Sequence, residues 1–207
     1  FIPAENIGEV MNQGIDAQVR WQDKIGEIHY NVGVNLTFTK NKLRESDELD
    51  NIEDYRKSVG RSTSTIFGLQ AEGLFGKDVQ LAGHPLQSYG AYQAGDIAYA
   101  DLNGDGKIDA ANDRTVIGQN FPSWTGGLSI NLFWKDFDFS ALFQGAFDVD
   151  KYCEAESSYA FYNGGKVLKK HLDRWTPENH NASYPRITKD SQTNFVTSSF
   201  WLEDGSY

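Results

Sequence analysis

The sequence is poor in the residues that build disulfide frameworks and helical membrane spans. Among 207 residues there is one cysteine, Cys153, with one methionine and five prolines, so an intrachain disulfide is excluded. No apolar run approaches the roughly 20 residues that a membrane-spanning helix needs, which excludes a helical membrane protein. Basic residues are also scarce, since 19 Lys and Arg stand against 29 Asp and Glu, a formal charge of −10. This balance argues against nucleic acid as a partner, because phosphate neutralisation takes clustered cations.

Aromatic residues, by contrast, are abundant. Phe, Tyr and Trp make up 14% of the chain, although its mean hydropathy is only −0.54. Residues 1–4 do not resemble the start of a signal peptide, and the sequence stops just after a turn signal, so we expect it to be part of a longer protein.

Strict alternation of apolar and polar residues predicts two β-hairpins. The first covers residues 14–38, with a polar turn at 23–27, and the second covers about 126–145, with its turn at Lys135 and Asp136. One face of the first hairpin carries Ile15, Ala17, Val19, Trp21, Ile28, Tyr30, Val32, Val34, Leu36 and Phe38. One face of the second carries Leu128, Ile130, Leu132, Trp134, Phe137, Phe139, Ala141 and Phe143.

Strand length and turn asymmetry bear on where these hairpins reside. The strands run to nine or eleven residues, which matches a tilted strand crossing a bilayer and exceeds the five or six usual in soluble sheets. Trp21 and Trp134 precede the short turns, where an aromatic girdle would lie, and the opposite strand ends lead into long segments, 39–125 and 146–199. A soluble sandwich shows the same alternation, so the pattern alone leaves lipid and protein core both open.

The intervening segments contain weaker signals. Residues 63–75 and 96–101 are candidate strands between the two hairpins, where the hairpin directions require an even number. Residues 166–175 predict a short helix, because apolar and aromatic residues recur four apart and Pro177 supplies a stop. We expect the aromatic residues Tyr159, Phe161 and Tyr162 to pack within their loop rather than to stack on a ligand.

The most specific local motif is a calcium-type loop. Residues 101–109 read D-x-N-x-D-G-x-I-D, in which oxygen ligands at positions 1, 3 and 5 converge on one ion and the glycine at position 6 allows the sharp turn. Position 12 is Asn112 where an acid is expected, and Asp113 follows it. The flanking segments look extended, so this is a loop without EF-hand helices. We predict structural Ca²⁺ on these residues: Asp101, Asn103, Asp105, the carbonyl of Lys107, Asp109 and Asp113. The last ligand stays open between Asp113, which needs one extra residue in the loop, and the weaker Asn112; the alternative is a Gly/Asp-rich turn that binds no ion.

No catalytic constellation is evident, so we predict that the protein is not an enzyme. The four histidines show no metal-binding spacing, and no nucleophile elbow occurs. Cys153 lacks a basic neighbour, and Glu154 and Glu156 are more simply explained as a solvated pair than as glycosidase carboxylates. The two glycine pairs, at 126–127 and 164–165, lack the strand–glycine–helix context of a phosphate loop.

Five separated segments together resemble one family, the SusC/RagA group of TonB-dependent outer-membrane transporters of Bacteroidota. They keep the family's order and span nearly the whole chain, although Ala94 and His180 stand where the family usually has proline. The segments are residues 6–16 (NIGEVMNQGID), residues 95–118 (GDIAYAD, the NGDG loop and DRTVIG), residues 137–145 (FDFSALFQG), residues 175–186 (WTPENHNASYPR) and residues 200–207 (FWLEDGSY).

The resemblance implies an all-β fold: part of an antiparallel transmembrane β-barrel with long strands, short periplasmic turns and long extracellular loops. Residues 1–207 would belong to the C-terminal part of a 22-stranded barrel, with the plug domain and the final strands absent. The implied function is outer-membrane import of glycan or peptide oligomers. The implied partners are a SusD-like lipoprotein and, through an absent N-terminal region, the TonB–ExbB–ExbD complex.

The membrane interpretation assigns the two faces of the hairpins. Ile28, Val32, Leu36, Leu128 and Leu132 would face lipid, whereas Asn31, Asn35, Ser129 and Asn131 would face a polar lumen. Because open sheet edges cannot face hydrocarbon, we expect this sequence alone to form an open curved sheet. The alternative is a secreted, calcium-stabilised β-sandwich that binds carbohydrate or a partner protein. A dockerin-like module fits less well, because dockerins carry two such loops on helices.

Overall fold

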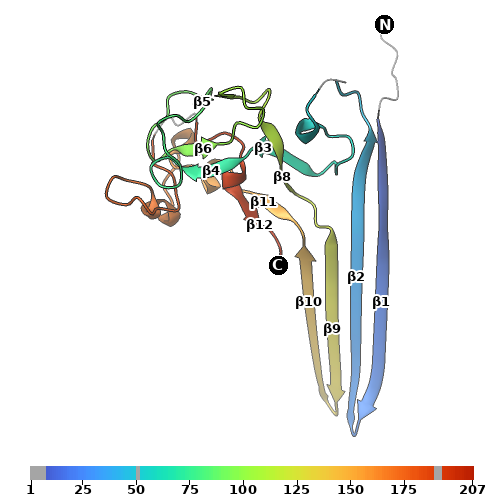
Figure 1. Cartoon of the computed structure of the whole chain (residues 1–207). Coiled ribbons are helices and arrows are strands. Elements are labelled where there is room, and N and C mark those ends of the chain that lie inside the picture. The colour runs from blue at the N-terminus through green and yellow to red at the C-terminus, as the bar shows by residue number, and fades with distance from the viewer. Residues whose placement is uncertain (1–7, 50–51, 189–192) are drawn as a thin grey trace.

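The protein consists of a long antiparallel sheet with a compact loop body at one end (Figure 1). The computed structural model describes residues 8–49, 52–188 and 193–207. Residues 6 and 7, which open the first family-like segment, lie outside this description. Both hairpin turns lie at the end of the sheet opposite the loop body, so the short connections share one side and the long ones the other.

The sheet contains four strands in the order β1-β2-β9-β10. They are β1 (Glu9–Ile25), β2 (Ile28–Glu45), β9 (Trp124–Trp134) and β10 (Phe137–Phe147). Both predicted hairpins are confirmed, and all four strands extend beyond the predicted ones at their loop-body ends. The turn predicted at 23–27 is shorter than expected, because residues 23–25 belong to β1. The turns are tight because Gly26 (φ 62°) and Lys135 (φ 54°) adopt the left-handed conformation that two-residue hairpin loops require.

The two hairpins lie side by side, because β2 pairs directly with β9 from Ile28↔Trp134 to Phe38↔Trp124. The candidate strands at 63–75 and 96–101 do contain β3 (Thr65–Leu69), β4 (Ala71–Leu74) and β6 (Ile97–Tyr99). They are not members of the long sheet. These strands have five, four and three residues and are too short to match the long strands of the sheet. They pair within the loop body instead.

The loop body is built from short strand pairs and single turns of 3₁₀-helix. β3 pairs with β8 (Arg114–Gln119), β4 with β6, β5 (Leu86–Gln87) with β7 (Lys107–Ile108), and β11 (Asp150–Tyr152) with β12 (Leu202–Asp204). The 3₁₀ turns are η1 (Asp54–Arg56), η2 (Ala155–Ser157), η3 (Tyr162–Gly164), η4 (Lys169–Asp173) and η5 (Ser199–Trp201). The helix expected at 166–175 is therefore reduced to the five residues of η4.

The hydrophobic core lies in the loop body and not on the sheet. Its buried members come from distant parts of the sequence: Leu69, Leu74, Ile97, Tyr99, Ile108, Tyr159, Trp175, Ala182, Tyr184 and Trp201. Tyr159 stacks on Phe195, with ring centroids 4.5 Å apart, and Tyr162 packs beside both rings. The expected internal packing is confirmed for these two tyrosines, whereas Phe161 is exposed. Across the described ranges, no helix has the length and apolar character to span a membrane.

Candidate functional site

The long sheet has one continuous apolar face. The register places most apolar residues of all four strands on the same side, together with the acidic Asp23 near the hairpin turn. Most of the large apolar residues are exposed, among them Val19 at 68%, Phe137 at 72% and Phe143 at 59%. We call this the apolar face: Ile15, Ala17, Val19, Trp21, Ile25, Ile28, Tyr30, Val32, Val34, Leu36, Phe38, Trp124, Gly126, Leu128, Ile130, Leu132, Trp134, Phe137, Phe139, Ala141, Phe143, Gly145 and Phe147. An exposed patch of this extent marks an interaction surface.

Aromatic rings gather at both ends of the apolar face. Near the hairpin turns, Trp134 stacks on Phe137 at 6.2 Å, and near the loop body Phe38 contacts Trp124 at 4.6 Å. Trp124 and Trp134 bound β9, and their ten residue steps correspond to about 34 Å along the strand. For a strand tilted by about 40° this is a height of about 26 Å, close to the apolar band of outer-membrane barrels.

The opposite face is mainly polar, and its side chains bond to one another. Ser140 donates to Asn131 (2.7 Å), and Thr37 donates to Asp16 (3.1 Å). Leu142 and Phe133 are its two large exposed apolar side chains. We call this the polar face: Asp16, Gln18, Arg20, Gln22, Lys24, His29, Asn31, Gly33, Asn35, Thr37, Thr125, Gly127, Ser129, Asn131, Phe133, Asp138, Ser140, Leu142, Gln144 and Ala146. The predicted segregation of the two sets onto opposite faces is confirmed.

The free edge of β10 begins a further pairing at its loop-body end. The backbone of Tyr207 exchanges two hydrogen bonds with Ala146, at 3.0 and 3.1 Å, and the Gly205 N–H donates to the Val149 carbonyl. Residues 205–207 therefore lie along the outer edge of β10 and point down the sheet.

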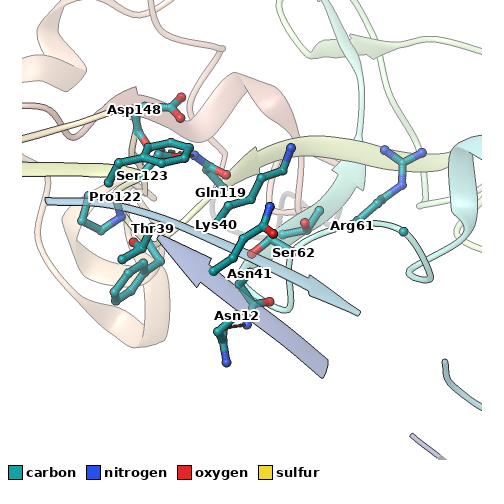
Figure 2. A pocket seen from close by; sticks show the side chains of 15 residues that line it. Asn12, Thr39, Lys40, Asn41, Arg61, Ser62, Gln119, Pro122, Ser123 and Asp148 are labelled. Atoms are coloured by element: carbon teal, nitrogen blue, oxygen red, sulfur yellow. Dashed lines mark hydrogen bonds between the residues drawn. The ribbon is translucent and has the colours of Figure 1, made fainter. Parts of the chain in front are cut away.

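A cavity of about 580 Å³ lies where the sheet meets the loop body. Figure 2 shows the side chains that line it, with Lys40 and Asn41 near the centre, Arg61 and Ser62 on one side, and Pro122 and Ser123 on the other. The cavity forms because β9 begins only opposite Phe38. Beyond Phe38, this edge of β2 has no continuous strand partner and makes only isolated contacts. Ser123 accepts a hydrogen bond from the Thr39 N–H in this way.

The calcium-type loop is closed by its own backbone. The Asp101 carboxylate accepts hydrogen bonds from the N–H groups of Gly104 (2.7 Å) and Gly106 (2.8 Å). Asp105 accepts one from Lys107 (2.8 Å). Gly104 and Gly106 both have positive φ and open space at the Cβ position, which confirms the sharp turn expected at position 6 of the motif.

At the end of the loop the structure brings Asp113, rather than Asn112, to the loop base. Asp113 is fully buried, and its two oxygens accept hydrogen bonds from the N–H groups of Leu102 and Asp109 (2.9 and 2.8 Å). Lys107 pairs with Asp109 across 3.0 Å, and this contact lowers the pKa of the Asp109 carboxyl. Within the described residues, no group of three or more His, Cys, Asp and Glu side chains is arranged as a metal site.

Two of the family-like segments, residues 95–118 and 175–186, meet in one buried cluster. Asp96 is fully buried and forms an ion pair with Arg186, whose Nε (2.8 Å) and Nη2 (2.9 Å) contact its carboxylate. It also accepts a hydrogen bond from Asn194 (2.8 Å). Trp175 lies over Gly95, so that a Cβ there would approach its ring to 2.4 Å. Gly95 and Asp96 belong to one of these segments, Trp175 and Arg186 to the other, and Asn194 to neither. No local signal predicts that they form one cluster.

His171 is a second buried polar anchor. Its Nδ1 accepts a hydrogen bond from the Leu168 N–H (2.9 Å), so its Nε2, 3.1 Å from the Ser158 carbonyl, carries the proton. Both contacts fit the neutral ring, and burial lowers the pKa of His171 below its usual 6.5. Cys153 is also buried, and burial raises the pKa of its thiol, which disfavours the reactive thiolate.

Acid is expected to destabilise the loop body through His171. The unfolded chain takes up a proton near pH 6.5 while the folded state resists it, so stability is complete above pH 6.5 and declines as the pH falls below that value. Thermal unfolding followed from pH 8 to pH 5 checks this. The decline should be shallower in His171→Gln and unchanged in the exposed control His180→Gln; equal slopes in all three proteins would contradict it.

An exposed apolar sheet with aromatic ends, backed by a polar face and with short turns on one side, is the arrangement found in the wall of an outer-membrane β-barrel. No protein-family model matches the sequence. It is 27% identical over 216 aligned positions to TonB-dependent receptor P26 of Formosa agariphila, covering 98% of this chain and 21% of the relative. It is 28% identical over 182 positions to TonB-dependent receptor P39 of the same organism, covering 71% of this chain and 18% of the relative.

The solved structures agree on the fold. The RagAB peptide transporter superimposes with a TM-score of 0.66 at 16% identity, covering 98% of this chain and 22% of that chain. Its open-open state gives the same TM-score at 17% identity. The chain is a homologue of the TonB-dependent receptors and spans about a fifth of the length of these relatives. TonB-dependent receptors are outer-membrane transporters and not enzymes.

Proposed function

We propose that residues 1–207 form part of the C-terminal transmembrane barrel of a TonB-dependent importer of nutrient oligomers, glycans or peptides. The observation that carries the proposal is the pairing of an exposed apolar face with a polar face on the same four strands. In this orientation the apolar face meets lipid, the polar face lines the lumen, the hairpin turns lie in the periplasm and the loop body lies outside the cell.

The edges of the sheet support a role as a slice of a larger barrel. β1 and β10 are the outermost strands of the described sheet, and unpaired edges cannot remain in hydrocarbon. Pairing of residues 205–207 with the top of β10 is the start that a further antiparallel strand would need. The runner-up, a calcium-stabilised sandwich, gains no support from the described residues, because the apolar face is exposed and carries no second sheet.

The expected partners follow from the same proposal. The match to a transporter described as the RagAB complex supports a SusD-like lipoprotein on the extracellular side, against the loop body. Energy would come from TonB–ExbB–ExbD, acting on parts of the protein outside these residues. The decisive experiment is extraction of the full-length protein from cells: we expect it in the outer-membrane fraction, released only by detergent. A monomer that stays soluble without detergent would contradict the proposal.

We further propose that Ca²⁺ braces the 101–113 loop. Each carboxylate oxygen of Asp101 and Asp113 accepts one N–H bond, which leaves a lone pair for a hard cation, and oxygen donors are the ligands that Ca²⁺ prefers. Asp101, Asn103, Asp105, the Lys107 carbonyl, Asp109 and Asp113 would hold the ion. The ion pair between Lys107 and Asp109 would open or shift on binding.

Calcium removal is expected to lower the Tm of the full-length protein in detergent. Calcium at 100 times its Kd would add about 2.7 kcal/mol to the free energy of unfolding, and chelation would remove this contribution. Asp105→Asn should abolish the calcium-dependent rise in Tm, while Asp136→Asn, in the distant β9–β10 turn, should retain it. A Tm that is the same with calcium and with chelator would remove the ion from the proposal.

A further inference from the structure

The apolar face of β2 ends in three consecutive cations. Along the outward-facing positions of this strand, six apolar residues from Ile28 to Phe38 are followed by Lys40, Lys42 and Arg44. The switch occurs directly beyond the Phe38–Trp124 contact, the aromatic limit of the apolar face. We call Lys40, Lys42 and Arg44 the basic strip. It stands out in a chain whose formal charge is −10.

Contacts with β1 confirm which way the basic strip points. Arg44 pairs with Glu9 (2.9 Å) and contacts Met11, so its side chain lies on the same side of the sheet as these two residues, beside the register shift between Glu9 and Val10. Lys40 pairs in register with Gln13 and Lys42 with Met11, so no acidic side chain faces either lysine across the strand pair. Within the described residues, neither lysine ammonium has a hydrogen-bond or ion-pair partner.

The surroundings of Lys40 combine charge with apolar surface. The cavity of about 580 Å³ next to it includes Phe38, Phe121 and Pro122 among its lining residues. Figure 2 shows Pro122 on one side of Lys40. Phe121 is 59% exposed. A ligand here would meet the ring of Phe38 on the sheet side and the Lys40 ammonium beyond it. Phe121 and Pro122 precede β9 and lie on the loop-body side, where Arg61 and Asp148 also line the cavity.

We propose that the basic strip binds the phosphate groups of lipid headgroups in the outer leaflet. The proposal rests on the proposed function, which places the loop-body end of the sheet at the outer surface. Its height then coincides with the headgroups, since the strip begins one outward-facing position beyond the aromatic rim. Neighbouring cations of the strip lie about 7 Å apart along the strand, so one lipid phosphate can contact two of the three cations at once.

The alternative occupant is an acidic protein surface. The strip is the direct continuation of the apolar face and shares its orientation, whereas the loop body rises from the same end of the sheet (Figure 1). A partner covering the loop body would leave a strip that points along the bilayer plane in contact with lipid. Charge complementarity and continuity with the lipid-facing surface therefore favour headgroup phosphate.

The test measures lipid binding by the full-length protein purified in a neutral detergent. The probes are lipid A that carries phosphate on its glucosamine disaccharide, the same lipid A after removal of its phosphates, and inorganic phosphate. We expect Lys40→Gln/Lys42→Gln to weaken binding of phosphorylated lipid A by about five-fold per lysine, or about 25-fold in all. Binding should also weaken as salt rises, because exposed charges are screened.

Two matched variants control for charge and fold. Lys40→Arg/Lys42→Arg keeps both charges and should bind as the original protein does. Arg20→Gln/Lys24→Gln removes two charges from the polar face of the same hairpin and should leave lipid binding unchanged. Dephosphorylated lipid A should bind weakly and equally to all variants, and inorganic phosphate should not compete at millimolar concentration.

Three results would overturn the inference: undiminished binding in the Lys→Gln pair, equal binding of dephosphorylated lipid A, or competition by inorganic phosphate alone. Loss of a co-purifying lipoprotein with no change in lipid binding would assign the strip to a protein partner and would also overturn it. If the proposed function is wrong, the result is different: the protein is soluble without detergent and does not enter bilayers. If the protein inserts into bilayers but does not bind lipid phosphate, only the basic-strip proposal is contradicted.

Discussion

Replacing Val34 by arginine is expected to lower the free energy of unfolding of the membrane-inserted protein by about 2–4 kcal/mol. Val34 lies on the apolar face and is 47% exposed. It pairs with Val19 on one side and Leu128 on the other, near the midpoint between the two aromatic ends. A guanidinium there would have to reach the interface along the strand or draw water into the hydrocarbon, and both are costly.

The neighbouring Asn35→Arg supplies the control, because successive residues of a strand point to opposite faces. Asn35 lies on the polar face, and its side chain extends over Gly127, where no side chain competes for space. We expect a change below about 0.5 kcal/mol, as for other substitutions at solvated positions. The measurement is urea unfolding of the full-length protein in lipid vesicles. Equal losses for the two variants would mean that the apolar face does not contact lipid.

The long sheet could be predicted from the sequence because its signal is local. Alternation along Ile28 to Phe38 fixes both the strand and the face of each side chain, and a register slip of one residue would reverse every assignment. Direct pairing of β2 with β9 was not evident, since it joins residues about 100 positions apart. The candidate strands at 63–75 and 96–101 carry weaker signals, and they form strands of only three to five residues that pair within the loop body.

The loop body was much less predictable, because its contacts are non-local. Tyr99 donates through its hydroxyl to the Thr193 carbonyl (2.7 Å), and Gln87 bridges Ile97, Tyr99 and Thr193 through its side-chain amide. No periodic pattern of residues in the sequence predicts such contacts. The calcium-type loop is an intermediate case. Its glycines and carboxylates are local, and the turn they predict is present, whereas the burial of Asp113 depends on the surrounding loop body.

Removal of the Asp96 carboxylate is expected to produce the largest loss of order in the loop body. Asp96→Ala deletes the acceptor of Arg186, Asn194 and the Gln93 N–H (2.9 Å). It leaves an unpaired guanidinium beside Trp175 and Gly95. Breaking a buried pair by deleting one partner costs about 3–5 kcal/mol, because the remaining charge loses both its solvent and its counter-ion.

Hydrogen exchange of the full-length protein in detergent locates the effect. Strands β4 and β6 and residues 184–188 should lose protection in Asp96→Ala, while β1, β2, β9 and β10 keep theirs, because the core and the long sheet share few buried residues. Asp54→Ala, which removes a fully exposed partner of Lys57, should leave the protection of every segment unchanged. Uniform loss across both parts in Asp96→Ala would show instead that the loop body and the sheet unfold as one unit, and the Asp96–Arg186 pair would then stabilise the barrel wall as well as the loops it joins.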